Sequence, residues 1–438
     1  MKKLFVYALS ALLISSCLPQ NVQVPQSPLL SVLERKSGLI AYLGVDGNLY
    51  VTDQSGRNPT KLTDDALIPQ SGSDPLLLYE YPTWSLDGSQ LAFISVSANG
   101  TQAKSKVLVA NMDDKSVNEI YTSDNERPIY LNWSPDNANV SFISTNVSNQ
   151  NIILQSVPSQ GGDRTILDTG SPYYWSWAPD GHVMIVHAGG ALASEPDHIA
   201  FLNVDSTTIT EQGLDLDSTS ASFQAPAWSP DGSHIALART SNKENEIVIT
   251  DAAGENLKKI GTFTSKTAFA WSGDSSRLAY LDGLQALDAG TIGSLHVVDL
   301  ETNKETAEDA NIIAFFWSPS GKEIAYFILL QANGDSSGSS TGSTDSSPQY
   351  VLELHVLDVT SGESRKLFTY RPTQQFLSVL PYFDQYHQSV TIWSPDNNNL
   401  VLSFLDSSGN PGIAVVAASG KLEPRLLAQG YLAFWSWK

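Results

Sequence analysis

The feature that most constrains the fold is a short motif that recurs along the chain. Each copy places a tryptophan before a small residue, usually serine, and a turn that usually carries an aspartate; an apolar strand follows the turn. Seven copies begin at Trp84, Trp133, Trp177, Trp228, Trp271, Trp317 and Trp393, and an eighth is expected at Trp437. Self-similarity at a nearly fixed period indicates one supersecondary unit that is repeated many times.

Each repeat unit has the length and the pattern of four short strands. The first strand carries the tryptophan, and the second, such as residues 90–94, is apolar. The third alternates between apolar and polar residues, as in residues 294–299, and the fourth is short and polar, as in residues 256–260. Four short strands in a unit of about 40 to 50 residues are typical of one blade of a β-propeller. The repeated tryptophans and aspartates are expected to be structural, since stacked repeats need the same packing in every unit.

The two ends of the repeat region are expected to complete one unit between them. Residues 38–64 have the pattern of second, third and fourth strands, and residues 431–437 have the pattern of a first strand. Pairing these segments would leave no free sheet edge. We therefore expect an all-β protein, an eight-bladed β-propeller of four-stranded antiparallel blades, in which the N- and C-terminal strands share one blade. A seven-bladed ring with one degenerate unit is the alternative.

The N-terminal segment has the features of a bacterial lipoprotein signal peptide. Lys2 and Lys3 precede a short apolar run, residues 4–14, which is too short to span a bilayer as a stable anchor. The run leads to Ile-Ser-Ser-Cys, which resembles a lipobox, and Cys17 is the only cysteine in the chain. The resemblance implies that Cys17 carries the lipid. An ordinary secretory signal with a chance cysteine is the alternative.

These features divide the chain into three regions. Residues 1–16 are the predicted signal peptide, and residues 17–37, which include the lipidated cysteine, form a flexible tether rich in proline and glutamine. Residues 38–438 form the predicted propeller, with a disordered low-complexity insert at residues 331–349. We expect the protein to lie in the bacterial cell envelope, outside the cytoplasm, and to contact the membrane only through its lipid anchor.

The net charge of the chain limits the kinds of molecule that it is expected to bind. The sequence has 46 acidic and 25 basic residues, for a formal net charge of −21 at pH 7. A field of this sign repels the phosphate backbone of nucleic acids. We therefore expect a protein or peptide partner and no nucleic acid, and the chain itself is expected to be monomeric.

The motif Trp-Ser-Pro-Asp-Gly, complete at residues 228–232 and followed by an apolar strand, resembles the repeat of the TolB-like propellers. The same repeat occurs in the propeller domains of tricorn and dipeptidyl-peptidase-type peptidases. The resemblance covers residues 38–438 and implies the propeller fold. Those peptidases carry their activity on a C-terminal α/β-hydrolase domain, and this sequence ends within the propeller, so we expect none of that activity here. TolB itself has an extra N-terminal domain, where this chain has the predicted tether.

The long loops are expected to gather on one face of the ring, which makes that face the predicted binding surface. The short turns between first and second strands lie on the opposite face, and loops on a rigid scaffold commonly carry binding residues. The candidate binding residues are Tyr382, Asp384, Tyr386, His387, Glu195 and His198. Alternatively, residues 380–387 fold over the central channel as a plug that buries its aromatic side chains, and residues 195–198 form a solvated loop.

We expect a non-catalytic scaffold that binds a protein, a peptide or a glycan. The alternative is a hydrolase or a lyase that uses carboxylate and histidine groups at the mouth of the central channel. That alternative requires the acidic and histidine candidates of both segments to converge within hydrogen-bonding distance. No metal site and no cofactor are expected, because the histidines lack zinc-ligand spacing and no glycine-rich phosphate loop follows a strand.

Overall fold

The computed structural model describes most of the predicted propeller. The described ranges are 38–72, 74–146, 152–189, 197–204, 209–214, 219–220, 224–286, 290–330 and 350–438. The predicted signal peptide, the tether and the insert at residues 331–349 lie outside the described residues. Within the described part of the chain, no helix is long and apolar enough to cross a membrane.

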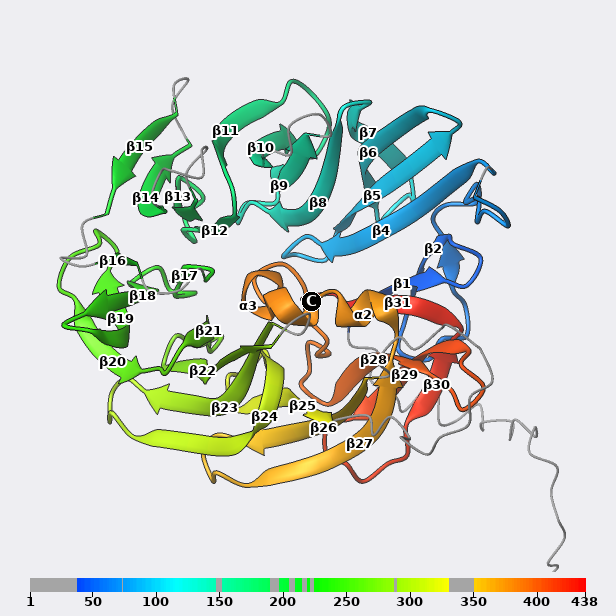
Figure 1. The fold of residues 1–438 in the computed structure, drawn as a ribbon. Coiled ribbons are helices and arrows are strands. Elements are labelled where there is room, and N and C mark those ends of the chain that lie inside the picture. Colours follow the sequence, from blue (N-terminus) through cyan, green and yellow to red (C-terminus); the bar gives the residue numbers. More distant parts are fainter. Residues whose placement is uncertain are drawn as a thin grey trace, which may run out of the picture. The chain divides into compact units, whose positions relative to one another are not determined.

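Antiparallel sheets of consecutive strands follow one another around a common centre (Figure 1). The first is β4 (Leu76–Trp84), β5 (Gln90–Asn99), β6 (Gln102–Asn111) and β7 (Val117–Ser123). The second is β8 (Glu126–Trp133), β9 (Asn139–Asn146), β10 (Ile152–Pro158) and β11 (Thr165–Gly170). The third is β12 (Tyr173–Trp177), β13 (Val183–Ala188), β14 (His198–Asn203) and β15 (Thr210–Gly213). The next has an inner strand in two pieces, and comprises β16 (Thr219–Ser220), β17 (Ala227–Trp228), β18 (His234–Ser241), β19 (Glu244–Asp251) and β20 (Lys258–Thr262).

The following ten strands form one continuous sheet. They are β21 (Lys266–Trp271), β22 (Arg277–Ala286), β23 (Gly290–Asp299), β24 (Glu305–Trp317), β25 (Glu323–Leu330), β26 (Val351–Asp358), β27 (Ser364–Pro372), β28 (Asn399–Leu405), β29 (Pro411–Ala417) and β30 (Arg425–Ala428). The long strand β24 pairs with β23 through its first part and with β25 through its second, and β27 likewise joins β26 to β28. Division at these two strands would give the eight units that the sequence predicts; the number of blades stays a prediction.

The two ends of the repeat region share one sheet, as the sequence predicts. The C-terminal strand β31 (Gly430–Trp435) pairs with β1 (Ile40–Gly44), which continues into β2 (Leu49–Thr52) and β3 (Thr60–Lys61). Figure 1 shows these N- and C-terminal strands, blue and red, side by side. The pairing covers the inner edge of β1, so this part of the fold is confirmed.

The register of this shared sheet corrects one position of the predicted repeat. In six of the seven other copies of the motif the tryptophan lies opposite the first apolar residue of the second strand, as Trp84 lies opposite Leu91. In the shared sheet the residue opposite Ile40 is Trp435. The repeat position is therefore held by Trp435, and the prediction of Trp437 was wrong.

The repeated motif folds as a tight turn that its own polar side chains hold. In the copy at Trp228, the Ser229 hydroxyl accepts a hydrogen bond from the His234 N–H at 3.0 Å and donates one to the Asp231 carboxylate at 2.6 Å. Asp231 also accepts from the Ser233 N–H at 3.0 Å. Burial raises the pKa of Asp231, but these hydrogen bonds outweigh it and lower the pKa to about 2. The serine and the aspartate of the motif therefore act on their own turn.

The tryptophans of the motif tie neighbouring units together. In five of them the indole N–H donates to a backbone carbonyl in the first strand of the preceding unit, and in Trp177 it donates to the Ser141 hydroxyl at 3.1 Å. The same contact spans the shared sheet, where Trp84 donates to the Phe434 carbonyl at 3.3 Å. The other pairs of this kind are Trp133 with Thr83, Trp271 with Ala227, Trp317 with Ala270 and Trp393 with Phe316, all at 2.9 to 3.0 Å.

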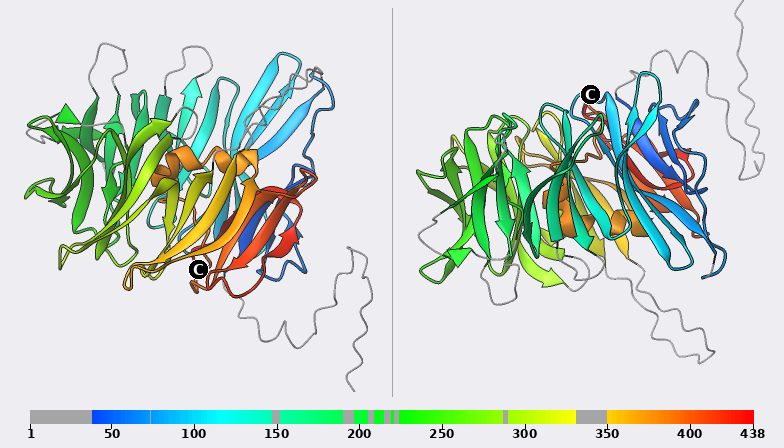
Figure 2. Two further views of the ribbon diagram at one scale, coloured as in Figure 1. Left: turned by 60° about the horizontal axis from the view of Figure 1, so that its bottom comes forward. Right: turned by 90° about the horizontal axis from the view of Figure 1, so that it is seen from above.

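The connection between β27 and β28 runs through the centre of the ring. It contains α2 (Gln374–Leu377), the 3-10 helix η1 (Leu380–Tyr382) and α3 (Phe383–Tyr386). These helices lie among the inner strands in each view (Figure 1, Figure 2). We call residues 373–391 the plug.

Candidate functional site

Apolar side chains of the plug fill the centre of the ring. Phe376, Leu380, Phe383 and Tyr386 are all buried. The Phe383 ring lies 4.8 Å, between centroids, from that of Phe315 on β24. Burial of large aromatic residues stabilises a fold by about 1.5 to 3 kcal/mol each. The segment that supplied four candidate binding residues thus fits the alternative expectation, in which it plugs the channel.

One glutamine anchors the plug to two inner strands. The Gln385 side-chain amide donates to the Trp175 carbonyl at 2.9 Å and accepts from the Trp175 N–H at 3.1 Å. Its amide nitrogen also lies 3.1 Å from the Tyr130 hydroxyl, which donates to the Gln385 carbonyl at 2.8 Å. Tyr130 belongs to β8 and Trp175 to β12, so this one residue links two sheets to the plug.

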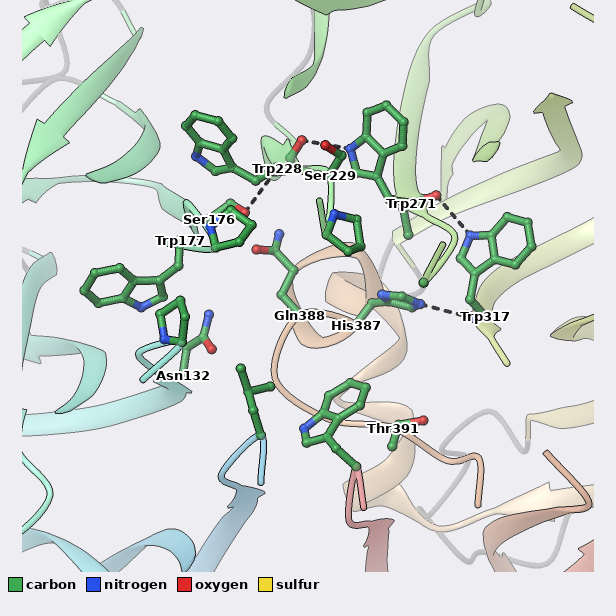
Figure 3. Close-up of a pocket in the computed structure, with 18 of the residues that line it drawn as sticks. Asn132, Ser176, Trp177, Trp228, Ser229, Trp271, Trp317, His387, Gln388 and Thr391 are labelled. Carbon is green, nitrogen blue, oxygen red and sulfur yellow. Dashed lines mark hydrogen bonds between the residues drawn. The ribbon is translucent and has the colours of Figure 1, made fainter. Parts of the chain in front are cut away.

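A pocket of about 460 Å³ lies against the plug, on the side of the ring where first strands turn into second strands (Figure 3). The motif turns supply its apolar wall, and the plug supplies its floor through Asp384, His387 and Gln388. Figure 3 shows Gln388 and His387 reaching from the plug toward the surrounding motif residues. The prolines of the wall are Pro135, Pro179, Pro230 and Pro319. This volume lies in the range of small-ligand sites.

The carboxylate of Asp384 is buried at the pocket floor with 6% of the residue exposed. It accepts hydrogen bonds from the Ala225 N–H at 3.1 Å and from the Gln385 N–H at 3.0 Å. Burial raises its pKa to about 6, although the backbone hydrogen bonds act in the opposite direction. Asp384 is therefore ionised at neutral pH and poorly compensated.

The side chain of His387 is neutral and accepts a hydrogen bond from the backbone. The Trp317 N–H donates to its Nε2 at 3.2 Å, so the ring proton resides on Nδ1. Burial lowers the pKa of His387 to about 4. Its ring stacks on Phe316 with a centroid distance of 6.1 Å. These contacts fix the orientation of the imidazole ring at the floor of the pocket.

The plug also provides hydrogen-bond partners for backbone groups where one inner strand is interrupted. Between β16 and β17 the backbone leaves the sheet near Pro226, because proline cannot donate to a strand ladder. Asp384 receives the N–H of Ala225, and the Gln388 amide donates to the carbonyl of Pro226 at 3.2 Å. Both residues thus have a structural role besides lining the pocket.

The remaining candidates lie elsewhere. Tyr382 is half exposed, and Tyr386 is buried against Tyr130 with a centroid distance of 5.0 Å. His198, at the start of β14, forms an ion pair with Glu211 at 2.9 Å. Glu195 lies outside the described residues. Of the five candidates that the structure describes, Asp384 and His387 line the central pocket and the other three do not.

The loop-rich face carries a hollow of a different kind. It measures about 1010 Å³ and lies between the connection before β4 and the β5–β6 hairpin, with Leu67, Lys104 and Asp124 in its lining. None of the predicted binding residues lines it. In the described part of the chain, no cluster of three or more His, Cys, Asp or Glu side chains is placed to hold a metal ion.

Comparisons with known proteins agree with the fold. No family model and no curated protein matches the sequence. Among solved structures, the chain is similar to prolyl endopeptidases, with a TM-score of 0.53 and 12% identity over 80% of this chain and 49% of theirs. It is also similar to a putative TolB from Agrobacterium tumefaciens, with a TM-score of 0.37 and 16% identity over 77% and 90% of the two chains. An oligogalacturonate lyase in complex with manganese has a TM-score of 0.46 and 12% identity over 87% and 98%.

These similarities concern the fold alone. The chain spans about half the length of the prolyl endopeptidases that it matches. Its repeated antiparallel sheets, closed by β1 and β31, define the class of protein. The chain is a β-propeller.

Proposed function

We propose that this chain is a membrane-tethered, extracytoplasmic binding module that takes part of a protein, peptide or glycan ligand into its central pocket. The observation that carries the proposal is that the plug forms the floor of the channel and leaves a pocket of about 460 Å³ on the motif-turn side. A concave, mostly apolar site with a few polar groups at its base is the usual form of a ligand site. The binding surface is therefore assigned to the face opposite the long loops.

The hydrogen bonds of the pocket favour binding over the hydrolase or lyase alternative. General acid–base catalysis needs a group whose proton or lone pair is available to the substrate. The Nε2 lone pair of His387 is used by the Trp317 N–H, so Asp384 has no available acid–base partner among the residues that line the pocket. His198 pairs with Glu211 on another sheet edge instead of joining them.

A substitution at the rim of the pocket tests the binding role. Leu86 lines the pocket, is partly exposed and follows β4 in the first motif turn, so Leu86→Lys should change the entrance without unfolding the ring. We expect Leu86→Lys to reduce capture of the ligand from a native envelope extract at least tenfold, a loss of about 1.4 kcal/mol or more in binding free energy. The matched control is Leu422→Lys, because Leu422 is 70% exposed and lies outside the pocket lining.

Quantitative mass spectrometry of the captured material would measure this effect, with the melting temperatures of both variants checked against the unsubstituted protein. Loss of a ligand in Leu86→Lys alone supports the pocket as its site. Equal capture by both variants would assign ligand binding to another surface, and the hollow beside the β5–β6 hairpin would be examined next.

The lipid anchor is tested at Cys17. We expect the full chain, expressed in bacteria with a radiolabelled or clickable fatty acid, to incorporate the label and to sediment with membranes. Cys17→Ala should abolish incorporation, because no other cysteine is present to accept the lipid. Label that persists in Cys17→Ala would contradict the proposed lipidation site.

A further inference from the structure

The floor of the central pocket carries a negative charge that no cation in its lining balances. The lining residues, all within the described part of the chain, include Asp384 but no lysine and no arginine. Asp384 accepts hydrogen bonds from the two backbone amides described above. Two amide dipoles compensate a buried carboxylate less than an ion pair does, which agrees with the raised pKa of this group.

The other ionisable groups that face Asp384 are uncharged at neutral pH. His387 lies on the same plug segment and has a pKa of about 4. Tyr130 on β8 and Tyr174 on β12 approach from two other elements, and burial together with the charge of Asp384 raises the pKa of both. The local charge at the floor is thus that of one carboxylate.

We propose that the pocket binds a protonated amine and that Asp384 is its counter-ion. The amine is either the ammonium group of a lysine side chain or amino terminus, or a free alkylammonium ion. The proposal rests on the function proposed above and adds the charge of the group that enters.

Three further observations fit an alkylammonium group. The proline and tryptophan residues of the wall offer apolar surface to methylene groups, while the charged end reaches the floor. The Gln388 amide nitrogen is used by the Pro226 carbonyl, which leaves its side-chain oxygen as an acceptor for an N–H. The net charge of −21 attracts cations toward the molecule as a whole.

The energetic reason is the cost of the unpaired carboxylate. Attraction between opposite charges is several times stronger in a partly buried site than in bulk water. A bound ammonium group therefore regains part of the desolvation cost that folding imposes on Asp384. A neutral ligand of the same shape would gain only the contact with the apolar wall.

Isothermal titration calorimetry of the mature protein tests the charge of the ligand. The probes are n-butylammonium chloride for a free amine, N-acetyl-lysinamide for a lysine side chain, and 1-butanol as the uncharged comparison. We expect one cation to bind per chain at pH 7.5, with a dissociation constant in the range of about 0.1 to 10 mM, and at least tenfold weaker binding of 1-butanol. Preference for one of the two cations distinguishes the free from the peptide source.

The matched variants are Asp384→Asn and Asp406→Asn. Asp406 also accepts backbone N–H groups, from Ser408 and Asn410 at 2.8 Å, but it is exposed on another turn. Asp384→Asn should weaken binding of the cations at least tenfold, and Asp406→Asn should leave it unchanged. The melting temperature of Asp384→Asn is measured beside its affinity, because asparagine can accept only one of the two N–H groups that the carboxylate accepts.

A pH series on the unsubstituted protein gives a test that needs no variant. Asp384 has a raised pKa of about 6, so lowering the pH from 7.5 to 5 protonates it, and the affinity for the cations should fall about tenfold. His387, Tyr130 and Tyr174 stay uncharged between pH 7.5 and pH 5. Asp384→Asn should show no such dependence.

Equal affinity for the cation and 1-butanol, or equal affinity at pH 5 and 7.5, would overturn the assignment of a cationic ligand. Absence of saturable cation binding at pH 7.5 up to about 10 mM would overturn it as well. Under any of these three outcomes, the capture experiment can still show that a ligand is lost in Leu86→Lys. In that case the pocket keeps its proposed binding function, and only the assignment of a positive charge to its ligand is wrong.

Discussion

Deletion of residues 431–438 is expected to abolish the cooperative thermal unfolding of the domain. The deletion removes most of β31, the strand that joins the C-terminal part of the ring to β1. It exposes the inner edge of β1 and leaves the indole of Trp84 without its acceptor, the Phe434 carbonyl. Open strand edges also promote pairing between molecules, so we expect aggregation to accompany the loss.

The size of the effect follows from burial. Leu432, Phe434 and Trp435 are at most 3% exposed. Burial of such side chains contributes about 1.5 to 3 kcal/mol each, or roughly 5 to 9 kcal/mol together. A domain typically has about 5 to 15 kcal/mol of total stability. The deletion therefore removes a large share of the free energy of unfolding.

Circular dichroism and calorimetric melts of the truncated protein would measure this loss. The control is deletion of Lys438 alone, because this residue is exposed and its removal leaves β31 complete. A truncated protein with the same melting temperature and enthalpy as the control would contradict the closure by β1 and β31.

The second large effect is expected for Gln385→Leu in the plug. Leucine fills a similar volume but cannot hydrogen-bond, so the Trp175 N–H and carbonyl lose their partner inside the ring. The Tyr130 hydroxyl keeps the Gln385 carbonyl but loses the contact with the side-chain amide. Each buried polar group left unsatisfied costs about 1 to 3 kcal/mol, so we expect a loss of about 3 kcal/mol or more.

Urea unfolding of Gln385→Leu and of Gln374→Leu would isolate this contribution. Gln374 lies in the same plug, in α2, and is exposed, so the same substitution there should change the free energy of unfolding by less than about 0.5 kcal/mol. Equal stability of the two variants would show that the hydrogen bonds of Gln385 do not hold the plug.

The repeat predicted the fold because it is a local pattern that recurs. A strand with a tryptophan, a turn of serine and aspartate, and an apolar strand need only short-range contacts to form, and these contacts are the ones observed at Ser229 and Asp231. The error at Trp437 has a physical reason. Trp-Ser-Trp occurs at residues 175–177 and 435–437, and the second tryptophan holds the repeat position in the former but the first in the latter. Only the pairing partner, more than 390 residues away, decides between them.

The candidate site could be predicted only in part. Residues 380–387 attract notice because aromatic, acidic and histidine side chains are concentrated there, and Asp384 and His387 do line the pocket. The importance of Gln385 and Gln388 has no signal in the sequence, because their partners lie 160 or more residues earlier in the chain. The proposed face differs from the face predicted from the sequence for a related reason. Loop length does not show that one connection turns inward and closes the channel from the loop side.

The plug changes the kind of cooperativity that a ring of repeats can have. In a repeat protein each unit contacts only its neighbours, so unfolding can begin in one unit and spread along the array. Here residues 373–391 contact β8, β12, β24 and β31 at once, through Tyr130, Trp175, Trp317 and Tyr431. Opening of one unit therefore strains the contacts of units that it does not touch. We therefore expect the amide hydrogens of all units to exchange in one cooperative step. In evolution, the gain or loss of a unit would require the plug to be repacked as well.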